Sequence, residues 1–228
     1  MQETLILAAL IIPGLVIAIV FHEVAHGWTA LSLGDPTAQE QRRLSLNPLR
    51  HVDPFGTVIL PGILALSGAP VFGWAKPVPV DKRRLRNPRY GMMAVAAAGP
   101  ATNFVLALVG ALALGVFLRF GGPLDPSAPN LLLAAALNFI AINIFLALFN
   151  MLPIPPFDGS HIVEGLLPPA GARVFNRVRP FGFMLVVALL LVVPWLFPEL
   201  RLIERVVLPP VEWVQDLFLS VAGWIAER

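Results

Sequence analysis

Hydrophobic residues are gathered in long runs that are separated by short polar connections. One run without a charged residue extends from Thr4 to Phe21 and stays largely apolar to Leu33, and two later runs cover residues 91–120 and 131–152. An α-helix rises about 1.5 Å per residue, so about 20 apolar residues cross the roughly 30 Å hydrocarbon core of a bilayer. Each of the three runs is therefore predicted to form a membrane-spanning helix.

Three other apolar runs are shorter or less regular. Residues 55–69 are short for a full crossing and carry Pro61 and Gly62 near their middle. Basic residues stand on both sides of this run, and cytoplasmic loops are enriched in Lys and Arg, so we predict a re-entrant element that enters and leaves on one side. Residues 181–197 form a short apolar span. The tail, 202–228, has apolar residues near helical spacing among acidic ones, which predicts an amphipathic helix at the interface or packed on the bundle.

These runs predict an all-α polytopic membrane protein with about five to six hydrophobic segments, folded as a single domain over residues 1–228. The composition agrees, because 57% of residues are hydrophobic and only 13% are charged, against about a quarter in soluble domains. The net charge of +2 comes from basic residues in loops rather than in one stripe. Such residues suit an anionic lipid surface and not a nucleic acid, so we expect a multi-pass protein of the cell (plasma) membrane.

The first predicted span contains the motif His-Glu-Val-Ala-His at residues 22–26. Positions i and i+4 share one helix face, so His22 and His26 can bind one zinc ion while Glu23 serves as a general base for peptide hydrolysis. A five-residue pattern also arises by chance. Ionisable groups in a membrane helix cost on the order of 2.5–3.5 kcal/mol each, however, and their presence there favours the functional interpretation.

A third ligand is expected because zinc peptidase sites commonly use three protein ligands. The sequence has no cysteine, so the ligand must be an imidazole or a carboxylate. Asp158 follows prolines that end the predicted span 131–152, and it lies on irregular backbone in an apolar setting. Two alternatives remain open: Asp158 could cap the helix that begins near Ser160, or His161 could bind the metal instead.

Other polar residues have simpler interpretations. His51 and Asp53 lie in the polar connection after the first span, where a solvated or helix-capping role fits better than metal binding. Asn103 and Asn143 lie inside predicted spans, where an amide typically forms an interhelical hydrogen bond, although Asn103 could also serve the site.

Residues 73–81, Gly-Trp-Ala-Lys-Pro-Val-Pro-Val-Asp, predict a small β-strand region near the active site. Pro77 and Pro79 lack donors along one edge, whereas Val78 and Val80 keep their amides on the other. A protease must hold an extended substrate, and strand addition at an exposed edge is a common way to do so. We expect this segment to guide the substrate, with a proline-stiffened linker as the alternative.

The sequence resembles the site-2 protease family, peptidase family M50, of intramembrane zinc metalloproteases, in its compact prokaryotic branch without a PDZ or CBS domain. The resemblance rests on the motif at 22–26, on Gly-Pro-Ala-Thr-Asn at 99–103, and on residues 150–159, which fit the pattern N-x-x-P-x-x-P-x-D-G. It implies that one Zn²⁺ per chain is bound by His22, His26 and Asp158. It also implies that Glu23 is the base and that Asn150 is a candidate oxyanion donor.

The expected function is that of an intramembrane zinc-dependent endopeptidase, which hydrolyses peptide bonds in or near transmembrane segments of substrate proteins. Its partners would be a membrane-spanning protein substrate and the lipid bilayer, with the active site nearer the cytoplasmic side. The alternative is a non-proteolytic zinc-binding membrane protein or metal carrier. Glu23 separates the two, because a carrier has no need of a general base beside its metal.

Overall fold

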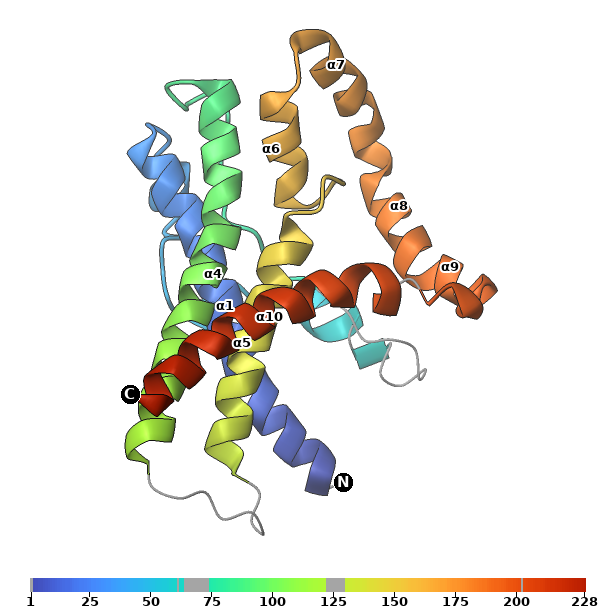
Figure 1. Cartoon of the computed structure of the whole chain (residues 1–228). Helices are drawn as coiled ribbons and strands as arrows, with labels where there is room; N and C mark the ends of the chain where they lie inside the picture. Colours follow the sequence, from blue (N-terminus) through green and yellow to red (C-terminus); the bar gives the residue numbers. More distant parts are fainter. Residues whose placement is uncertain (1, 61, 64–73, 122–129, 202) are drawn as a thin grey trace. The chain divides into compact units, whose positions relative to one another are not determined.

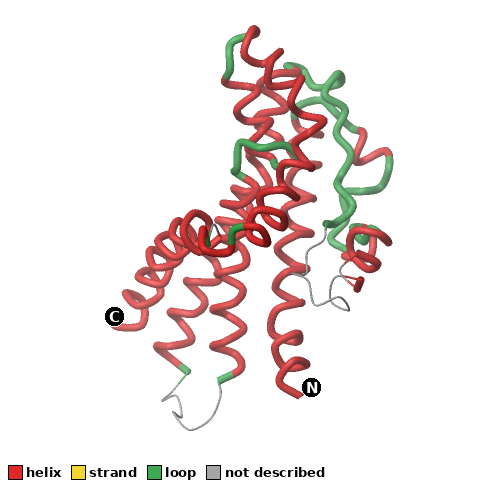
Figure 2. Tube along the Cα trace, turned by 90° about the vertical axis from the view of Figure 1, so that its right-hand side faces the viewer, coloured by secondary structure: helices red, strands yellow, loops and turns green. Residues whose placement is uncertain are grey.

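The structure is a computed structural model that describes residues 2–60, 62–63, 74–121, 130–201 and 203–228. The described part of the chain consists of helices and loops, and Figure 2 draws no strand in it. The long helices are α1 (Gln2–Ser32), α4 (Pro88–Phe120), α5 (Leu131–Asn150) and α10 (Leu208–Glu227), which Figure 1 labels. The shorter ones are α2 (Thr37–Glu40), η1 (Pro48–Arg50), η2 (Pro54–Ile59), α6 (Asp158–Leu166), α7 (Pro169–Val178), η3 (Arg179–Phe181), α8 (Gly182–Val187), η4 (Ala188–Val192), α9 (Val193–Leu196), η5 (Pro198–Leu200) and η6 (Ile203–Val207).

Three helices in the described residues are long and apolar enough to cross a membrane. They are Ala8–Ser32 within α1, α4 and α5, and they coincide with the three runs predicted as spans. The prediction of an all-helical membrane protein is therefore confirmed for the described chain. In residues 182–196, α8, η4 and α9 follow one another directly, and the residues at their junctions keep helical backbone angles. Residues 61 and 64–69 of the predicted re-entrant run lie outside the described residues.

The chain divides into two compact units. The first comprises residues 1–18, 100–151 and 202–228, and the second comprises 19–99 and 152–201. Because the division falls inside α1 and α4, both helices contribute residues to each unit.

The core of the first unit is built from small and branched side chains of α4, α5 and α10. Ala107 and Ala111 of α4 meet Ile140 and Ile144 of α5, and all four are fully buried. One face of α10 joins this core through residues near helical spacing, namely Val211, Val214, Phe218 and Ala222. The tail thus packs on the bundle, as one of its two sequence interpretations predicted.

Buried amides link three helices in this unit. The Nδ2 of Asn103 donates to the carbonyl of Ala18 at 3.2 Å and to Oδ1 of Asn143 at 2.9 Å. Both asparagines are fully buried. The prediction of interhelical hydrogen bonds from α4 to α1 and α5 is therefore confirmed.

In the second unit, the end of α1 packs against the start of α4 and the segment before it. Ala30, Leu85 and Val95 form the buried centre of this contact. The helix stops at Ser32 because Gly34 takes a φ of 106°, a left-handed conformation that glycine adopts without strain. This packing fixes the part of α1 that carries residues 22–26.

Residues 74–81 form an extended loop and not the predicted strand, and Gly73 lies outside the described residues. The amide of Lys76 donates to the carbonyl of His51 at 2.8 Å, and the amide of Val78 donates to the Glu23 carboxylate at 2.7 Å. A regular strand needs a partner strand, whereas these two amides bond to a loop carbonyl and a side chain. The predicted β-strand region is therefore not found in the described residues 74–81, and the amide of Val78 is already engaged by Glu23.

Candidate metal centre

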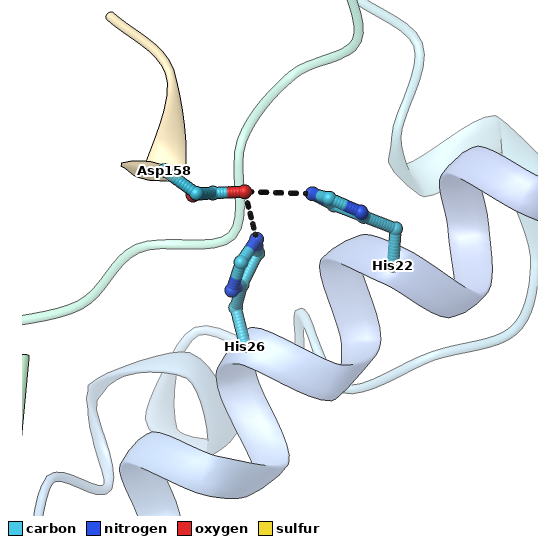
Figure 3. A group of neighbouring side chains, drawn as sticks. All are labelled: His22, His26 and Asp158. Carbon is cyan, nitrogen blue, oxygen red and sulfur yellow. Dashed lines mark hydrogen bonds and ion pairs between the residues drawn. The ribbon is translucent and has the colours of Figure 1, made fainter. Parts of the chain in front are cut away.

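Two imidazoles of α1 form the first half of the site. His22 and His26 are one helical turn apart, so both project from one face, and their ring centroids lie 4.6 Å apart at nearly a right angle. Both residues are buried, at 7% and 8% exposure. Figure 3 shows the two rings converging on a single point.

Asp158 supplies the other half from the first turn of α6. Its Oδ2 lies 3.1 Å from Nε2 of His22 and 3.4 Å from Nε2 of His26, as Figure 3 shows. Burial raises the pKa of Asp158, but the contacts with the two histidines outweigh it and hold that pKa at about 2. The carboxylate is therefore ionised and offers a negatively charged oxygen to both rings.

The backbone of α4 fixes the orientation of His26. Its Nδ1 lies 2.7 Å from the carbonyl oxygen of Val95, and a carbonyl can only accept a hydrogen bond. The proton of a neutral ring therefore sits on Nδ1, and the lone pair of Nε2 faces Asp158. Such a bond from the far nitrogen is the usual support of a metal-binding imidazole.

A glycine of α4 leaves space for the rings. A Cβ atom at Gly99 would lie 2.5 Å from Nε2 of His26 and 2.6 Å from Nε2 of His22. Contacts under 3.0 Å do not occur for a real Cβ. A side chain at this position would therefore require the two imidazoles or α4 to shift.

The three side chains fit a metal ion. Ligand atoms of His22, His26 and Asp158 all lie within 4.8 Å of one another. Two imidazole nitrogens and one carboxylate oxygen are the ligand types that catalytic zinc sites use. In the deprotonated form of the two rings, their nitrogen lone pairs and the Asp158 carboxylate converge in a mostly buried space, and a metal ion there would satisfy all three groups.

Glu23 lies next to this group and is itself held in place. It follows His22 on α1, is partly buried, and accepts a 2.7 Å hydrogen bond on Oε2 from the amide of Val78. The order of residues in the motif therefore places a carboxylate beside the candidate metal ligands.

Other predicted candidates lie apart from the His–Asp group. His51 has Nε2 2.7 Å from the carbonyl of Ser45, and Asp53 accepts from the amides of Phe55 and Gly56 at the start of η2. These are structural roles, which the sequence had favoured for both residues.

The alternative ligand His161 also has a different environment. The Nη1 of Arg179 lies 3.2 Å from both ring nitrogens of His161. Glu164 forms ion pairs with Arg179 at 2.6 Å and with Lys82 at 2.9 Å. Burial and Arg179 lower the pKa of His161 to about 4. The ring is therefore neutral at pH 7, and it belongs to an ionic cluster rather than to the group of three.

Asn150 is the last residue of α5, in the first unit, where its amide donates to the carbonyl of Leu146 at 2.9 Å. Its role in the site stays a prediction.

Sequence reasoning singled out Val78 and the motif at 99–103, but it did not find the bond from the Val78 amide to Glu23, the space that Gly99 leaves for the two rings, or the bonds of Arg43 to residues 76–77. The Nη2 of Arg43 donates to the carbonyls of Lys76 and Pro77 at 2.8 and 3.3 Å. The small-residue run around Gly99 was a signal for close helix contact, but nothing in the sequence pairs Arg43 or Glu23 with residues 76–78.

Comparisons with known proteins give consistent matches. The model of peptidase family M50 matches residues 125–193. A Bacillus subtilis (strain 168) protein named "Putative zinc metalloprotease YwhC" is 37% identical over 175 residues, which cover 77% of each chain.

Two other relatives carry similar names. "Putative zinc metalloprotease Rip2" of Mycolicibacterium smegmatis (strain ATCC 700084 / mc(2)155) is 32% identical over 80% of this chain and 66% of its own length. "Putative zinc metalloprotease MJ0611" of Methanocaldococcus jannaschii is 40% identical over 31% of this chain and 32% of its own length. No solved structure gives a significant match.

Proposed function

The chain belongs to peptidase family M50, and from this premise we propose that it is an intramembrane zinc-dependent endopeptidase that hydrolyses peptide bonds in or near transmembrane segments of other proteins. The observation that carries the proposal is the convergence of His22, His26 and Asp158 within 4.8 Å of one another, with Glu23 adjacent. These three residues would hold one zinc ion per chain. Three apolar helices long enough to span a bilayer support a site within the membrane.

Each side chain has a defined task in this proposal. Bound zinc supplies Lewis acidity, which makes a water molecule easier to deprotonate and polarises the scissile carbonyl. Glu23 accepts the proton of the attacking water and then delivers it to the nitrogen of the leaving amine. His26 keeps Nε2 available because Nδ1 is bonded to Val95, and Asp158 contributes the negative charge that a divalent cation needs.

Asn150 is proposed as a donor to the oxygen that gains negative charge when the carbonyl is attacked. An amide N–H aimed at such an oxygen stabilises the transition state more than the ground state. The motif at 150–159, which places Asn150 and Asp158 at the spacing typical of the family, supports this role.

The proposed substrate is a membrane-spanning protein whose helix unwinds near the scissile bond. Helical carbonyls are engaged in hydrogen bonds, so an extended stretch must form before attack. We propose that residues 73–81 lie along this stretch. Because the Val78 amide already donates to Glu23, the substrate would contact other groups of the segment.

We propose a single membrane domain over residues 1–228 in the cell membrane, with the active site nearer the cytoplasm. The sharing of α1 and α4 between both compact units supports one domain. The basic residues between Arg42 and Arg89, in the same unit as the site, support the orientation, because such residues favour the cytoplasmic side. The runs 55–69 and 181–197 are proposed to complete five to six apolar segments, the first as a re-entrant element.

The test is Glu23→Gln in the full-length protein, reconstituted in liposomes with a single-span reporter protein. We expect zinc content to stay at one ion per chain while cleavage falls by at least about a hundredfold, since the base is lost and the ligands remain. Glu212→Gln on an exposed position of α10 is the matched control and should cleave normally. Cleavage by Glu23→Gln at the normal rate would reject Glu23 as the base, whereas zinc binding without any cleavage by the unchanged protein would favour a zinc carrier.

A further inference from the structure

The segment formed by residues 76–81 is tied to the rest of its unit at both ends. At the start, Nη2 of Arg43 donates to the carbonyls of Lys76 and Pro77 at 2.8 and 3.3 Å. At the end, the amide of Asp81 donates to Oδ2 of the fully buried Asp35 at 2.6 Å. The position of the backbone between these points is therefore set by two charged side chains.

Between these ends, the segment contacts the proposed base. The amide of Val78 donates to Oε2 of Glu23 at 2.7 Å. Prolines on both sides of Val78 restrict its backbone further, because the ring of Pro79 limits the residue before it. The Val78 amide is thus held by a stiff backbone, and its hydrogen bond to the Glu23 carboxylate is short.

Close packing keeps this donor near α1. Val78 is 7% exposed, and a Cβ atom built at Gly27 would lie 2.8 Å from its Cγ1. Gly27 directly follows His26, so the absence of a side chain after the motif allows the segment to approach the helix.

Arg43 is itself well fixed. Its amide donates to the carbonyl of Ala38 at 2.8 Å, and the residue is 9% exposed. The Nη2 of a guanidinium carries two N–H groups at fixed positions in one plane, so this single nitrogen can donate to two neighbouring carbonyls.

We propose that Arg43 is a positioning residue for the hydrolysis, and that it acts through residues 76–78 by holding the Val78 amide against Glu23. The bond fixes one carboxylate oxygen and thereby restricts rotation of the side chain about its terminal torsions. Glu23 then meets the attacking water in one orientation rather than many, which lowers the barrier of the chemical step. The inference rests on the proposed function, since it requires Glu23 to be the base.

Two changes test it in the full-length protein with the single-span reporter. Arg43→Met removes the guanidinium and keeps an unbranched apolar chain. An ester analogue at Val78, introduced as the α-hydroxy acid by nonsense suppression, removes the N–H and keeps the side chain. Each is expected to lower kcat by roughly ten- to a hundredfold, the usual range for a hydrogen bond to a charged group. Zinc content should not change, because the metal ligands are untouched. KM should change less than kcat, because the lost bond is to Glu23 and not to the substrate.

The combination of the two changes gives the decisive result. If Arg43 acts through the Val78 amide, the double variant should lose no more kcat than the more impaired of the two single variants. Arg43→Lys should recover part of the loss. Arg50→Met is the matched control, because this arginine also donates to a backbone carbonyl, that of Arg42, but makes no contact with residues 76–78 among the bonds described. It should behave as the unchanged protein.

Several outcomes would overturn the inference while leaving the proposed function intact. In each of them, Glu23→Gln is inactive. The ester analogue at Val78 keeps the normal kcat, or the kcat losses of Arg43→Met and the ester analogue multiply in the double variant. Alternatively, one of these two changes raises kcat, or Arg50→Met loses as much kcat as Arg43→Met. If Arg43→Met loses zinc or unfolds, the ester analogue alone decides. Normal cleavage by Glu23→Gln would instead overturn the role of Glu23 as the base, and absence of cleavage by the unchanged protein would overturn the proposed function itself.

Discussion

At the scale of single residues, Gly99 decides whether two imidazoles can face Asp158. Gly99→Ala would place a methyl group 2.5 Å from Nε2 of His26, so the rings or α4 must move. We expect zinc content, measured by elemental analysis, to fall well below one ion per chain, with activity lost in parallel. Gly223→Ala is the control, because a Cβ there meets nothing within 4 Å. Full zinc occupancy in Gly99→Ala would show that the close approach is not required.

The surroundings of His161 predict a pH dependence of stability. Burial, Arg179 and Lys82 together lower its pKa from 6.5 to about 4, although the negative charges of Glu164 and Asp158 act in the opposite direction. Between those pH values the unfolded chain binds a proton that the folded chain does not, so stability falls as the pH drops from 6.5 to 4.

We expect His161→Asn to reduce this loss, which amounts to up to roughly 3 kcal/mol. The measurement is the apparent melting temperature in detergent at pH 7.5 and pH 4.5. Because both proteins keep the same zinc ligands, the comparison isolates the contribution of His161. An equal fall in both proteins would contradict the assignment.

The residues of the site were only partly predictable from the sequence. Spacing alone places His22 and His26 on one helix face, because helical geometry is local. The contacts of Glu23 with Val78, and of Arg43 with Lys76 and Pro77, join segments far apart in the chain, and no periodic pattern encodes them.

At the scale of helices, the bond between Asn103 and Asn143 gives the next prediction. Asn103→Leu should destabilise the protein by about 1 kcal/mol and at most about 2, as for interhelical bonds in membranes, because Oδ1 of Asn143 loses this donor. Thermal unfolding measures this loss of stability. Zinc content should remain normal, which distinguishes a packing role of Asn103 from a role in the metal site. The double change to Leu at both positions should recover part of the stability, and a normal melting temperature in Asn103→Leu would argue against the bond.

Run length predicted α1, α4 and α5 well, because a membrane span requires a minimum number of apolar residues. Run length did not predict the change of hydrogen-bonding pattern in residues 182–196, where the chain passes from α8 through the π-helical η4 into α9 with helical backbone angles at both junctions. The loop at 74–81 was predicted as a strand because its composition fits one, but a strand is defined by its partner.

At the scale of the whole molecule, a metal centre joins the beginning of the chain to its last third. His22 and Asp158 are separated by 136 positions, yet their side chains lie 3.1 Å apart. Two helices, α1 and α6, thus contribute to one site only when the fold is complete. Metal binding should therefore also stabilise the folded protein, since the unfolded chain offers no such site.

The most direct test of the central claim is a diffraction structure of the purified protein with anomalous data at the zinc absorption edge. The account predicts one ion per chain, with Nε2 of His22, Nε2 of His26 and a carboxylate oxygen of Asp158 each about 2.0–2.2 Å away. An ion held by other residues, or a fully active protein in which Asp158 lies beyond bonding distance of the metal, would contradict it.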